Sequence, residues 1–145
     1  MRITVDDLLK SKGYEVLSIT PDALVYKALQ LLADKNVGAL LVFQSGALVG
    51  IFSERDYARK LVLKGRFSIN TAVREVMTDS VITVEPGDDI EYCMRLMTDK
   101  RVRHLPVVSE GRVVGVISIG DIVKAIISDQ KFTIGLLEEY ITGGR

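Results

Sequence analysis

Cysteine, histidine and tryptophan are nearly missing from this chain of 145 residues, which has one Cys, one His and no Trp. A single cysteine, Cys93, excludes an internal disulfide and suits a reducing compartment, so we expect a cytoplasmic protein. A single histidine, His104, excludes a metal site built from several imidazoles and leaves a catalytic imidazole without an obvious partner. We therefore expect no metal requirement.

The chain also lacks an excess of charge of either sign and a long apolar run. Its 19 basic and 19 acidic side chains cancel, which argues against nucleic acid or a membrane surface as a partner. Apolar runs such as Ala39–Phe43 are far shorter than the roughly 20 residues that cross a bilayer. No charged segment followed by an apolar one opens the sequence, so we expect no signal peptide. An apolar fraction of 48% indicates an ordered globular protein.

What the sequence does contain is an internal repeat with an offset of 65 residues. Residues 19–57 align with residues 84–122 without a gap. The identical pairs are Pro21/Pro86, Leu31/Leu96, Asp34/Asp99, Lys35/Lys100, Val37/Val102, Leu40/Leu105, Val42/Val107, Gly46/Gly111, Val49/Val114, Gly50/Gly115, Ser53/Ser118 and Asp56/Asp121. Two long copies favour a closed pseudo-two-fold pair over a solenoid, with any ligand site duplicated.

Each half is predicted to be strand, helix, strand, strand, helix. The ranges expected in the first half are Val16–Ile19, a helix with Val25, Ala28, Leu29 and Leu32 on one face, Ala39–Phe43, Leu48–Phe52 and Asp56–Leu63. Those in the second half are Val81–Val84, a helix capped at Asp88 with Ile90, Cys93, Met94 and Met97 on one face, Leu105–Val108, Val113–Ile117 and Asp121–Ile127. Nearly continuous apolar strands indicate sheets covered on both faces.

The fold class we expect is therefore α/β (α+β), with two pseudo-symmetric βαββα halves packed through their sheets. Residues 1–66 are assigned to the first half with an N-terminal helix near Thr4–Lys12, and residues 67–80 to a linker. Residues 81–145 are assigned to the second half, with a further helix near Thr133–Ile141.

The most specific pattern is Gly-hydrophobic-hydrophobic-Ser-x-x-Asp, found at Gly50–Asp56 and again at Gly115–Asp121. Serine at the N-cap and aspartate three residues later resemble a capping box, which satisfies free backbone N–H groups and needs no ligand. The alternative is a phosphate bound at the helix start and a ribose diol bound by the carboxylate. Duplication at matched positions favours the second interpretation.

A second constellation is Arg103-His104-Leu105-Pro106, where the first half has Gly38-Ala39-Leu40-Leu41. A lone histidine at the start of a strand is usually structural, but the neighbouring arginine makes contact with an anion plausible. Pro106 removes a backbone donor, so its strand should lie at an edge or bend. The two sites should therefore differ.

Together these motifs resemble tandem CBS domains, a Bateman module, of the stand-alone bacterial kind. The sequence segments that carry this resemblance are Gly38–Val42, Ser53–Asp56, Val76–Thr78, Arg103–Val107, Ile117–Lys124 and Glu139–Thr142. The resemblance implies a non-catalytic regulatory module that binds adenosine-containing ligands, with AMP or NAD(H) favoured over ADP and ATP, in clefts between the repeats. We also expect a two-fold homodimer, because the apolar helical faces and the two terminal helices exceed what one small pseudo-symmetric unit would cover. A regulated partner on another chain would respond to the ligand.

The resemblance further implies a role for particular residues. Asp56 and Asp121 would hold ribose hydroxyls, and Ser53 and Ser118 would face phosphate. The positions expected beside the adenine are Ser18, Gly38 and Ala39 in the first half, and Thr83, Arg103, His104 and Pro106 in the second. Positive charge would come from Arg55 in the first half, and from Arg103 or Lys124 in the second, where Ile119 and Gly120 complete the motif.

Two other classes stay open. One is a purely structural dimerisation module whose clefts are unoccupied and whose Ser/Asp pairs only cap helices. The other is a nucleotide-using enzyme, which the absence of an identifiable general base or metal cluster disfavours.

Overall fold

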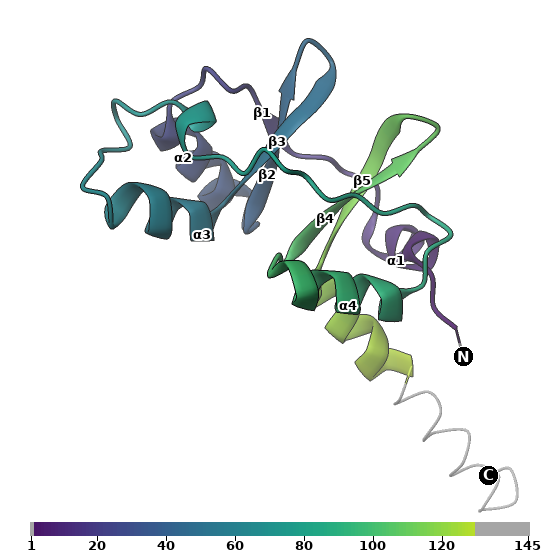
Figure 1. The fold of residues 1–145 in the computed structure, drawn as a ribbon. Helices are drawn as coiled ribbons and strands as arrows, with labels where there is room; N and C mark the ends of the chain where they lie inside the picture. Colours follow the sequence, from purple (N-terminus) through teal and green to yellow (C-terminus); the bar gives the residue numbers. More distant parts are fainter. Residues whose placement is uncertain (1, 130–145) are drawn as a thin grey trace, which may run out of the picture. The chain divides into compact units, whose positions relative to one another are not determined.

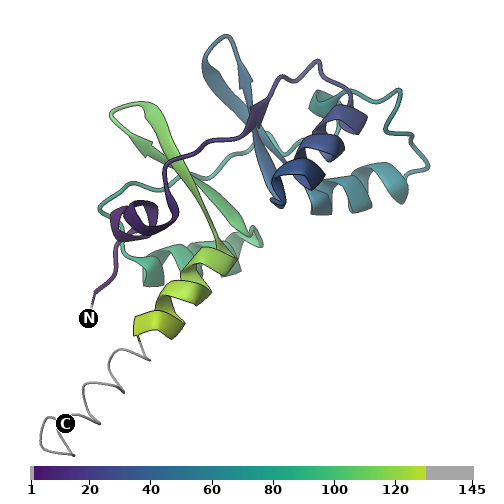
Figure 2. The same ribbon diagram turned by 180° about the vertical axis from the view of Figure 1, so that it is seen from behind.

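A computed structural model describes residues 2–129, and the chain divides into two compact units (Figures 1 and 2). The repeat-1 unit is Val16–Ile82. Among the described residues, the repeat-2 unit combines residues 2–15 with residues 83–129. The N-terminal segment thus belongs with the second repeat, whereas the sequence placed it with the first.

The repeat-1 unit is a three-stranded sheet in the order β1-β2-β3, with helices after β1 and β3. Its elements are β1 (Ser18–Ile19), α2 (Val25–Lys35), β2 (Ala39–Gln44), β3 (Ala47–Ser53), α3 (Glu54–Asp56), the π-helical turn η1 (Tyr57–Val62) and the 3-10 turn η2 (Val73–Glu75). Strand β1 runs parallel to β2, and β2 runs antiparallel to β3. The predicted order of elements is confirmed.

The described part of the repeat-2 unit contains a hairpin of two antiparallel strands and three helical segments. Its elements are α1 (Val5–Lys12), α4 (Ile90–Lys100), β4 (His104–Ser109), β5 (Arg112–Ser118) and a helix at residues 119–129. The predicted helix at Thr133–Ile141 lies outside the described residues.

The two hairpins are built alike because their turns share a backbone conformation. Ser45 and Gly46 have φ of 52° and 81°, and Glu110 and Gly111 have φ of 51° and 75°. Positive φ at both central residues matches the right-handed twist of the strands, which is why each turn keeps a glycine. A register shift follows Val42 in one hairpin and the aligned Val107 in the other. The structural repeat therefore extends to the irregularities of the sheet.

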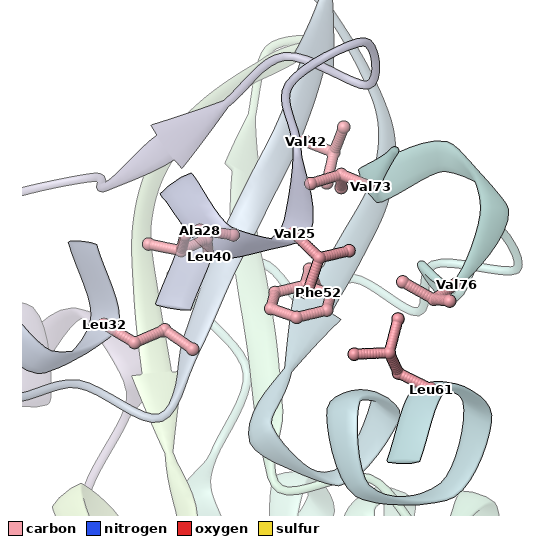
Figure 3. Close-up of a cluster of buried hydrophobic side chains, with 9 residues drawn as sticks. All are labelled: Val25, Ala28, Leu32, Leu40, Val42, Phe52, Leu61, Val73 and Val76. Atoms are coloured by element: carbon pink, nitrogen blue, oxygen red, sulfur yellow. The ribbon is translucent and has the colours of Figure 1, made fainter. Parts of the chain in front are cut away.

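The core of the repeat-1 unit lies between α2, the sheet, and residues of the segment expected to be a linker (Figure 3). Its buried members are Val25, Ala28, Leu32, Leu40, Val42, Phe52, Leu61, Val73 and Val76. Leu40, Leu41 and Val42 are buried in succession, so both faces of β2 are covered, as the continuous apolar run predicted. Val73 and Val76 follow the repeat in sequence but complete its core.

In the repeat-2 unit, helix α1 takes the place that Val73 and Val76 have in the repeat-1 unit. Its capping box joins Thr4 to Asp7, and its apolar face buries Val5, Leu8 and Leu9. Backbone hydrogen bonds run from Val5 N–H to Asp88 O (2.8 Å) and from Ile90 N–H to Ile3 O (3.0 Å). The N-terminal helix is thus fixed to the start of α4.

The glycine of each Gly-h-h-Ser-x-x-Asp motif lies under the segment that completes its unit. A Cβ built on Gly115 would come within 2.6 Å of Leu9 Cδ2, and one on Gly50 within 2.5 Å of Met77 Sδ. A Cβ at either position would force the neighbouring side chain to move, so glycine permits close approach here and does not serve a turn.

Pro106 explains why the strand predicted at Val81–Val84 in the second repeat is shorter than β1, the corresponding strand of the first repeat. In the repeat-1 unit, Leu41 N–H donates to Leu17 O (3.1 Å), and β1 pairs with β2 at two positions. Proline at the aligned position has no N–H. Only a single bridge, from Val84 to Val107, remains of the strand predicted at Val81–Val84. Strand β4, which contains Pro106, lies at an edge of its two-stranded sheet, as predicted.

Two local predictions were wrong by small amounts. Helix α4 is capped by Asp89, whose carboxylate accepts from Tyr92 N–H (2.8 Å), and not by Asp88. The carboxylate of Asp88 instead accepts from Glu85 N–H (2.8 Å) in the preceding turn. The helix predicted at Asp56–Leu63 begins at Glu54 and widens into the π-helical turn η1.

Candidate functional site

The candidate sites are two strand-to-helix turns, one at the end of β3 and one at the end of β5. At the first, Ser53 Oγ accepts from Asp56 N–H (3.2 Å), and Asp56 Oδ2 accepts from Ser53 N–H (3.0 Å). At the second, Ser118 Oγ accepts from Asp121 N–H (3.1 Å), and Asp121 Oδ2 accepts from Ser118 N–H (2.8 Å). The capping box predicted from the sequence is thus present in both units.

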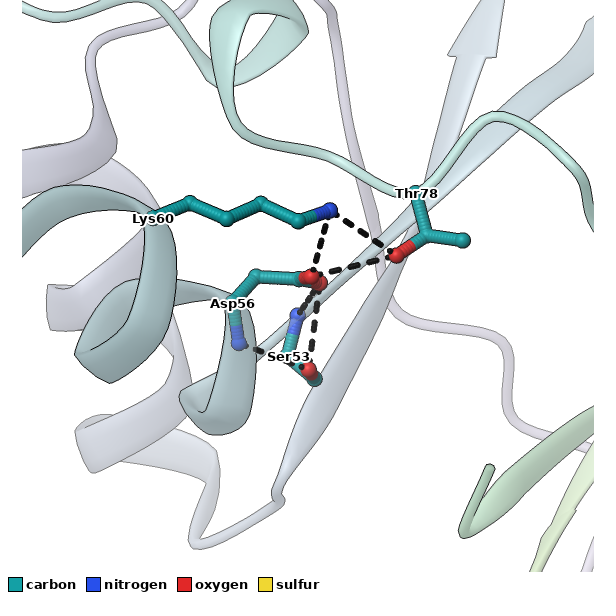
Figure 4. A network of polar contacts seen from close by, with 4 residues as sticks. All are labelled: Ser53, Asp56, Lys60 and Thr78. Carbon is teal, nitrogen blue, oxygen red and sulfur yellow. Dashed lines mark hydrogen bonds and ion pairs between the residues drawn. The ribbon is translucent and has the colours of Figure 1, made fainter. Parts of the chain in front are cut away.

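In the repeat-1 unit, the carboxylate of Asp56 is saturated by protein donors (Figure 4). Its Oδ2 also accepts from Ser53 Oγ–H (3.1 Å), while Oδ1 accepts from Thr78 Oγ1–H (3.1 Å) and pairs with Lys60 Nζ (3.0 Å). Lys60 also donates to Thr78 Oγ1 (3.3 Å). Asp56 is only 7% exposed, so a ligand would have to displace part of this network.

In the repeat-2 unit, the carboxylate of Asp121 has fewer partners. Lys12 Nζ donates to Asp121 Oδ2 (2.7 Å) and to the backbone oxygen of Val116 (2.8 Å). The Ser118 and Lys12 donors both use Oδ2, and Oδ1 accepts no hydrogen bond from residues 2–129. The Asp121 side chain is 19% exposed, so an acceptor oxygen remains for a ligand in this unit.

The lysine that pairs with each carboxylate comes from a different place in the fold. Lys60 lies one turn after Asp56 in the same helical segment, an i,i+4 pair. Its aligned position in the second repeat is Ala125, which carries no charge. The cation of the repeat-2 unit is supplied instead by Lys12, the last residue of α1.

Electrostatics keep the Asp121 carboxyl ionised. Burial acts to raise its pKa, but hydrogen bonds from Lys12 and from the backbone and side chain of Ser118, with the charge of Lys12, hold the pKa below its ordinary value of 3.8. An ionised carboxylate is the form that accepts hydrogen bonds from a diol, so Asp121 is in the state that the predicted role requires.

His104 and Arg103 stand at the start of β4, directly against the second turn. The backbone oxygen of Arg103 accepts from Ile119 N–H (2.9 Å), and His104 pairs with Ser118 across the hairpin. Burial lowers the pKa of His104 below its ordinary value of 6.5, and the charges of Lys12 and Arg103 lower it further against the opposing charge of Asp121. The ring is therefore neutral at pH 7 and adds a hydrogen-bonding group without a charge.

The remaining predicted positions fall into two groups. In the repeat-2 unit, the helix that begins after Ser118 carries Ile119, Gly120 and Lys124, of which Gly120 and Lys124 are exposed. In the repeat-1 unit, Gly38 and Ala39 lie beside the first turn, where Gly38 O accepts from Glu54 N–H (3.1 Å). Arg55 is half-buried on α3. Ser18 is exposed on β1, Thr83 is exposed just before the bridge residue Val84, and Pro106 is buried in β4.

Sequence reasoning missed three polar residues that contact the motif carboxylates: Lys12, Lys60 and Thr78. Lys60 could have been found from its i,i+4 spacing to Asp56. Lys12 lies 109 residues before Asp121, and no local pattern connects the two.

Other reactive groups are inert or missing from the described part of the chain. Cys93 is fully buried on α4, and burial, with the charges of Asp88 and Asp89, raises its pKa to about 11. The thiol is thus a core group, as predicted. Residues 2–129 hold no group of three metal-ligating side chains, and no helix among them is long and apolar enough to span a membrane.

Comparison with known proteins agrees with this geometry. The family model of the CBS domain matches residues 5–63 and again residues 73–128. The mitochondrial CBS domain-containing protein CBSX3 of Arabidopsis thaliana is 41% identical over 97% of this chain and 73% of its own length.

Solved structures give the same result. A protein with CBS domains from Burkholderia ambifaria is 48% identical, with a TM-score of 0.86 over 88% of this chain and 96% of that one. The CBS domain pair of protein MJ0100, in complex with 5′-methylthioadenosine and S-adenosyl-L-methionine, is 24% identical, with a TM-score of 0.73 over 89% of this chain and 99% of that one. The chain belongs to the CBS-domain family and is a regulatory tandem pair, with its fold as the sequence predicted.

Proposed function

We propose that this CBS pair is a sensor of adenosine-containing ligands, with AMP or NAD(H) favoured, and that it signals ligand binding to a separate regulated protein. The observation that carries the proposal is the state of Asp121. Its carboxylate is ionised and fixed through Oδ2, while Oδ1 has no protein donor among residues 2–129. A ribose diol supplies the O–H donors that such an oxygen lacks.

The ligand bound by a distant relative supports the same class of molecule. Both small molecules named in the MJ0100 complex contain adenosine. The polar turn of the repeat-2 unit has the groups that an adenine nucleotide needs. These are a carboxylate for the ribose, a helix start and Arg103 for phosphate, and His104 with Thr83 near the base.

The two units should not bind equally. Asp56 is saturated by Ser53, Thr78 and Lys60, which favours a structural role for the first turn. We therefore assign the tighter site to the repeat-2 unit. Binding would act by population shift, favouring the conformation of the pair that holds the ligand better.

A nucleotide panel tests the proposal. Thermal unfolding is followed with AMP, ADP, ATP, NAD, NADH and S-adenosylmethionine, for the wild type and for Asp121→Asn. Asp99→Asn, on the exposed side of α4, is the matched control. A ligand at 100 times its dissociation constant should add about 2.7 kcal/mol to the free energy of unfolding.

We expect at least one ligand to stabilise the wild type and Asp99→Asn but not Asp121→Asn. No stabilisation of the wild type by any ligand would leave the structural dimerisation module as the better account. Turnover of ATP or NAD by the wild type would instead favour an enzyme.

We also propose a cytoplasmic homodimer. Exposed apolar side chains support self-association, and in the repeat-2 unit they include Tyr92, Val123 and Ile127. Sedimentation of the full chain at micromolar concentration should give a dimer, and a monomer with and without nucleotide would reject this part of the proposal.

A further inference from the structure

The repeat-2 turn contains one charged group that the CBS motif does not supply. Lys12 Nζ donates to Asp121 Oδ2 (2.7 Å) and to Val116 O (2.8 Å), so it is held at two points beside the strand-to-helix turn. An ammonium group has three N–H donors. Two are used here, and no acceptor among residues 2–129 takes the third.

The position of Lys12 is fixed by the packing of α1. Leu9 and Val5 are completely buried, and Leu9 lies directly over Gly115. Backbone hydrogen bonds join Val5 N–H to Asp88 O and Asp6 N–H to Pro86 O. Because Lys12 is the last residue of this docked helix, its ammonium group reaches the turn from a rigid element rather than from a loose terminus.

Lys12 lies where a phosphate would be bound. Its Nζ and the backbone nitrogen of Ser118 donate to the same oxygen, so Nζ is within two hydrogen-bond lengths of the N-cap. In a nucleotide, the 5′-phosphate and the diol belong to the same ribose. A diol on Asp121 Oδ1 therefore brings the phosphate to the surroundings of Ser118 and Lys12.

The charge of Lys12 also removes an obstacle. An ionised Asp121 alone would repel a phosphate bound beside it, and the adjacent ammonium cancels that charge. Gly120 has replaced the arginine of the first repeat, and Ala125 has replaced Lys60, so the turn itself has no other cation in these two positions.

We propose that Lys12 is a specificity-determining residue of the repeat-2 site, which selects ligands that carry an anionic group on the ribose over the corresponding nucleosides. This inference rests on the proposed function and adds to it the contribution of a helix outside the repeat. The class of ligand is a nucleoside 5′-phosphate rather than a neutral nucleoside.

The test compares AMP with adenosine, since both carry the same base and diol. Calorimetry measures both dissociation constants for the wild type, Lys12→Met, Lys12→Arg and Lys10→Met. Lys10 is the matched control because it is also a lysine of α1, paired with Asp6 (Nζ to Oδ2, 3.1 Å) away from the turn. Circular dichroism and melting temperature check that each variant is folded.

We expect Lys12→Met to weaken the binding of AMP about tenfold or more, because a charge-assisted contact to phosphate is lost. The affinity for adenosine should change much less. Lys12→Arg should restore most of the preference for AMP, and Lys10→Met should match the wild type. The salt dependence of AMP binding should also decrease in Lys12→Met.

A different pattern would overturn the inference. If Lys12 only positions Asp121, Lys12→Met weakens the binding of AMP and of adenosine by the same factor. The ratio of their dissociation constants then stays at the wild-type value. If AMP binding is unchanged in Lys12→Met, the residue is not in the site. A wild type that binds neither AMP nor adenosine contradicts the proposed function itself, which separates the two failures.

Discussion

The substitution Gly115→Ala tests whether α1 completes the repeat-2 unit. Its added Cβ would lie 2.6 Å from Cδ2, 3.1 Å from Cδ1 and 3.4 Å from Cγ of Leu9, a completely buried side chain. Overpacking of this kind costs about 1–3 kcal/mol. In a chain of this size, that lowers the melting temperature by several degrees.

The double variant Leu9→Ala/Gly115→Ala makes the test specific. Leu9→Ala alone should cost about 2–5 kcal/mol, because it leaves a cavity beneath α1. In the double variant, the new methyl group enters this cavity, so the loss should be smaller than the sum of the single losses by about 1 kcal/mol or more. Gly87→Ala, where an added Cβ meets nothing within 4 Å, is the control.

The assay is unfolding in denaturant, with the free energy of unfolding obtained from the midpoint and slope for the wild type and each of the four variants. Additive losses for Leu9→Ala and Gly115→Ala would mean that the two residues do not touch. The packing of α1 on the second repeat would then be refuted, and with it the position of Lys12.

Three further predictions concern single residues. Because the pKa of folded His104 lies below 6.5, the unfolded chain binds the proton more readily, and the free energy of unfolding should fall as the pH drops from about 6.5 towards that lower pKa. Denaturant unfolding at about pH 7.5 and pH 5.5 should show this loss in the wild type and less of it in His104→Gln; equal losses would contradict it. Arg103→Ala should weaken the stronger class of nucleotide sites about tenfold in calorimetry and reduce its salt dependence, and two identical sites per chain would show that the phosphate is elsewhere. Cys93 should react with an aromatic disulfide reagent at neutral pH only after unfolding, because its thiol is buried and has a pKa of about 11; fast reaction of the native protein would contradict the burial.

The sequence was sufficient for the repeated architecture because each half carries its own local signals. Glycine at Gly46 and Gly111 marks the turns, and the apolar period of residues 25–35 and 90–100 marks the helices. The capping boxes at Ser53 and Ser118 could also be predicted, since their partners lie three residues away. Local spacing therefore predicted the part of each site that is local.

What the sequence could not supply depends on contacts between distant segments. The apolar residues of α1 suit either repeat equally well, so only the structure shows that Leu9 packs on Gly115. The role of Lys12 depends on that packing, so it could not be predicted from the sequence either. The saturation of Asp56 likewise depends on Thr78, which lies beyond the repeat.

The most direct test of the central claim is the affinity of the wild type for AMP and for its 2′,3′-dideoxy analogue, measured by calorimetry alongside Asp121→Asn. If Asp121 Oδ1 accepts a hydrogen bond from the ribose, the wild type should prefer AMP by about ten- to a hundredfold, and Asp121→Asn should lose most of that preference. Equal affinity of the wild type for both ligands, or a variant that loses melting temperature but keeps its preference for AMP, would mean that the carboxylate only caps the helix.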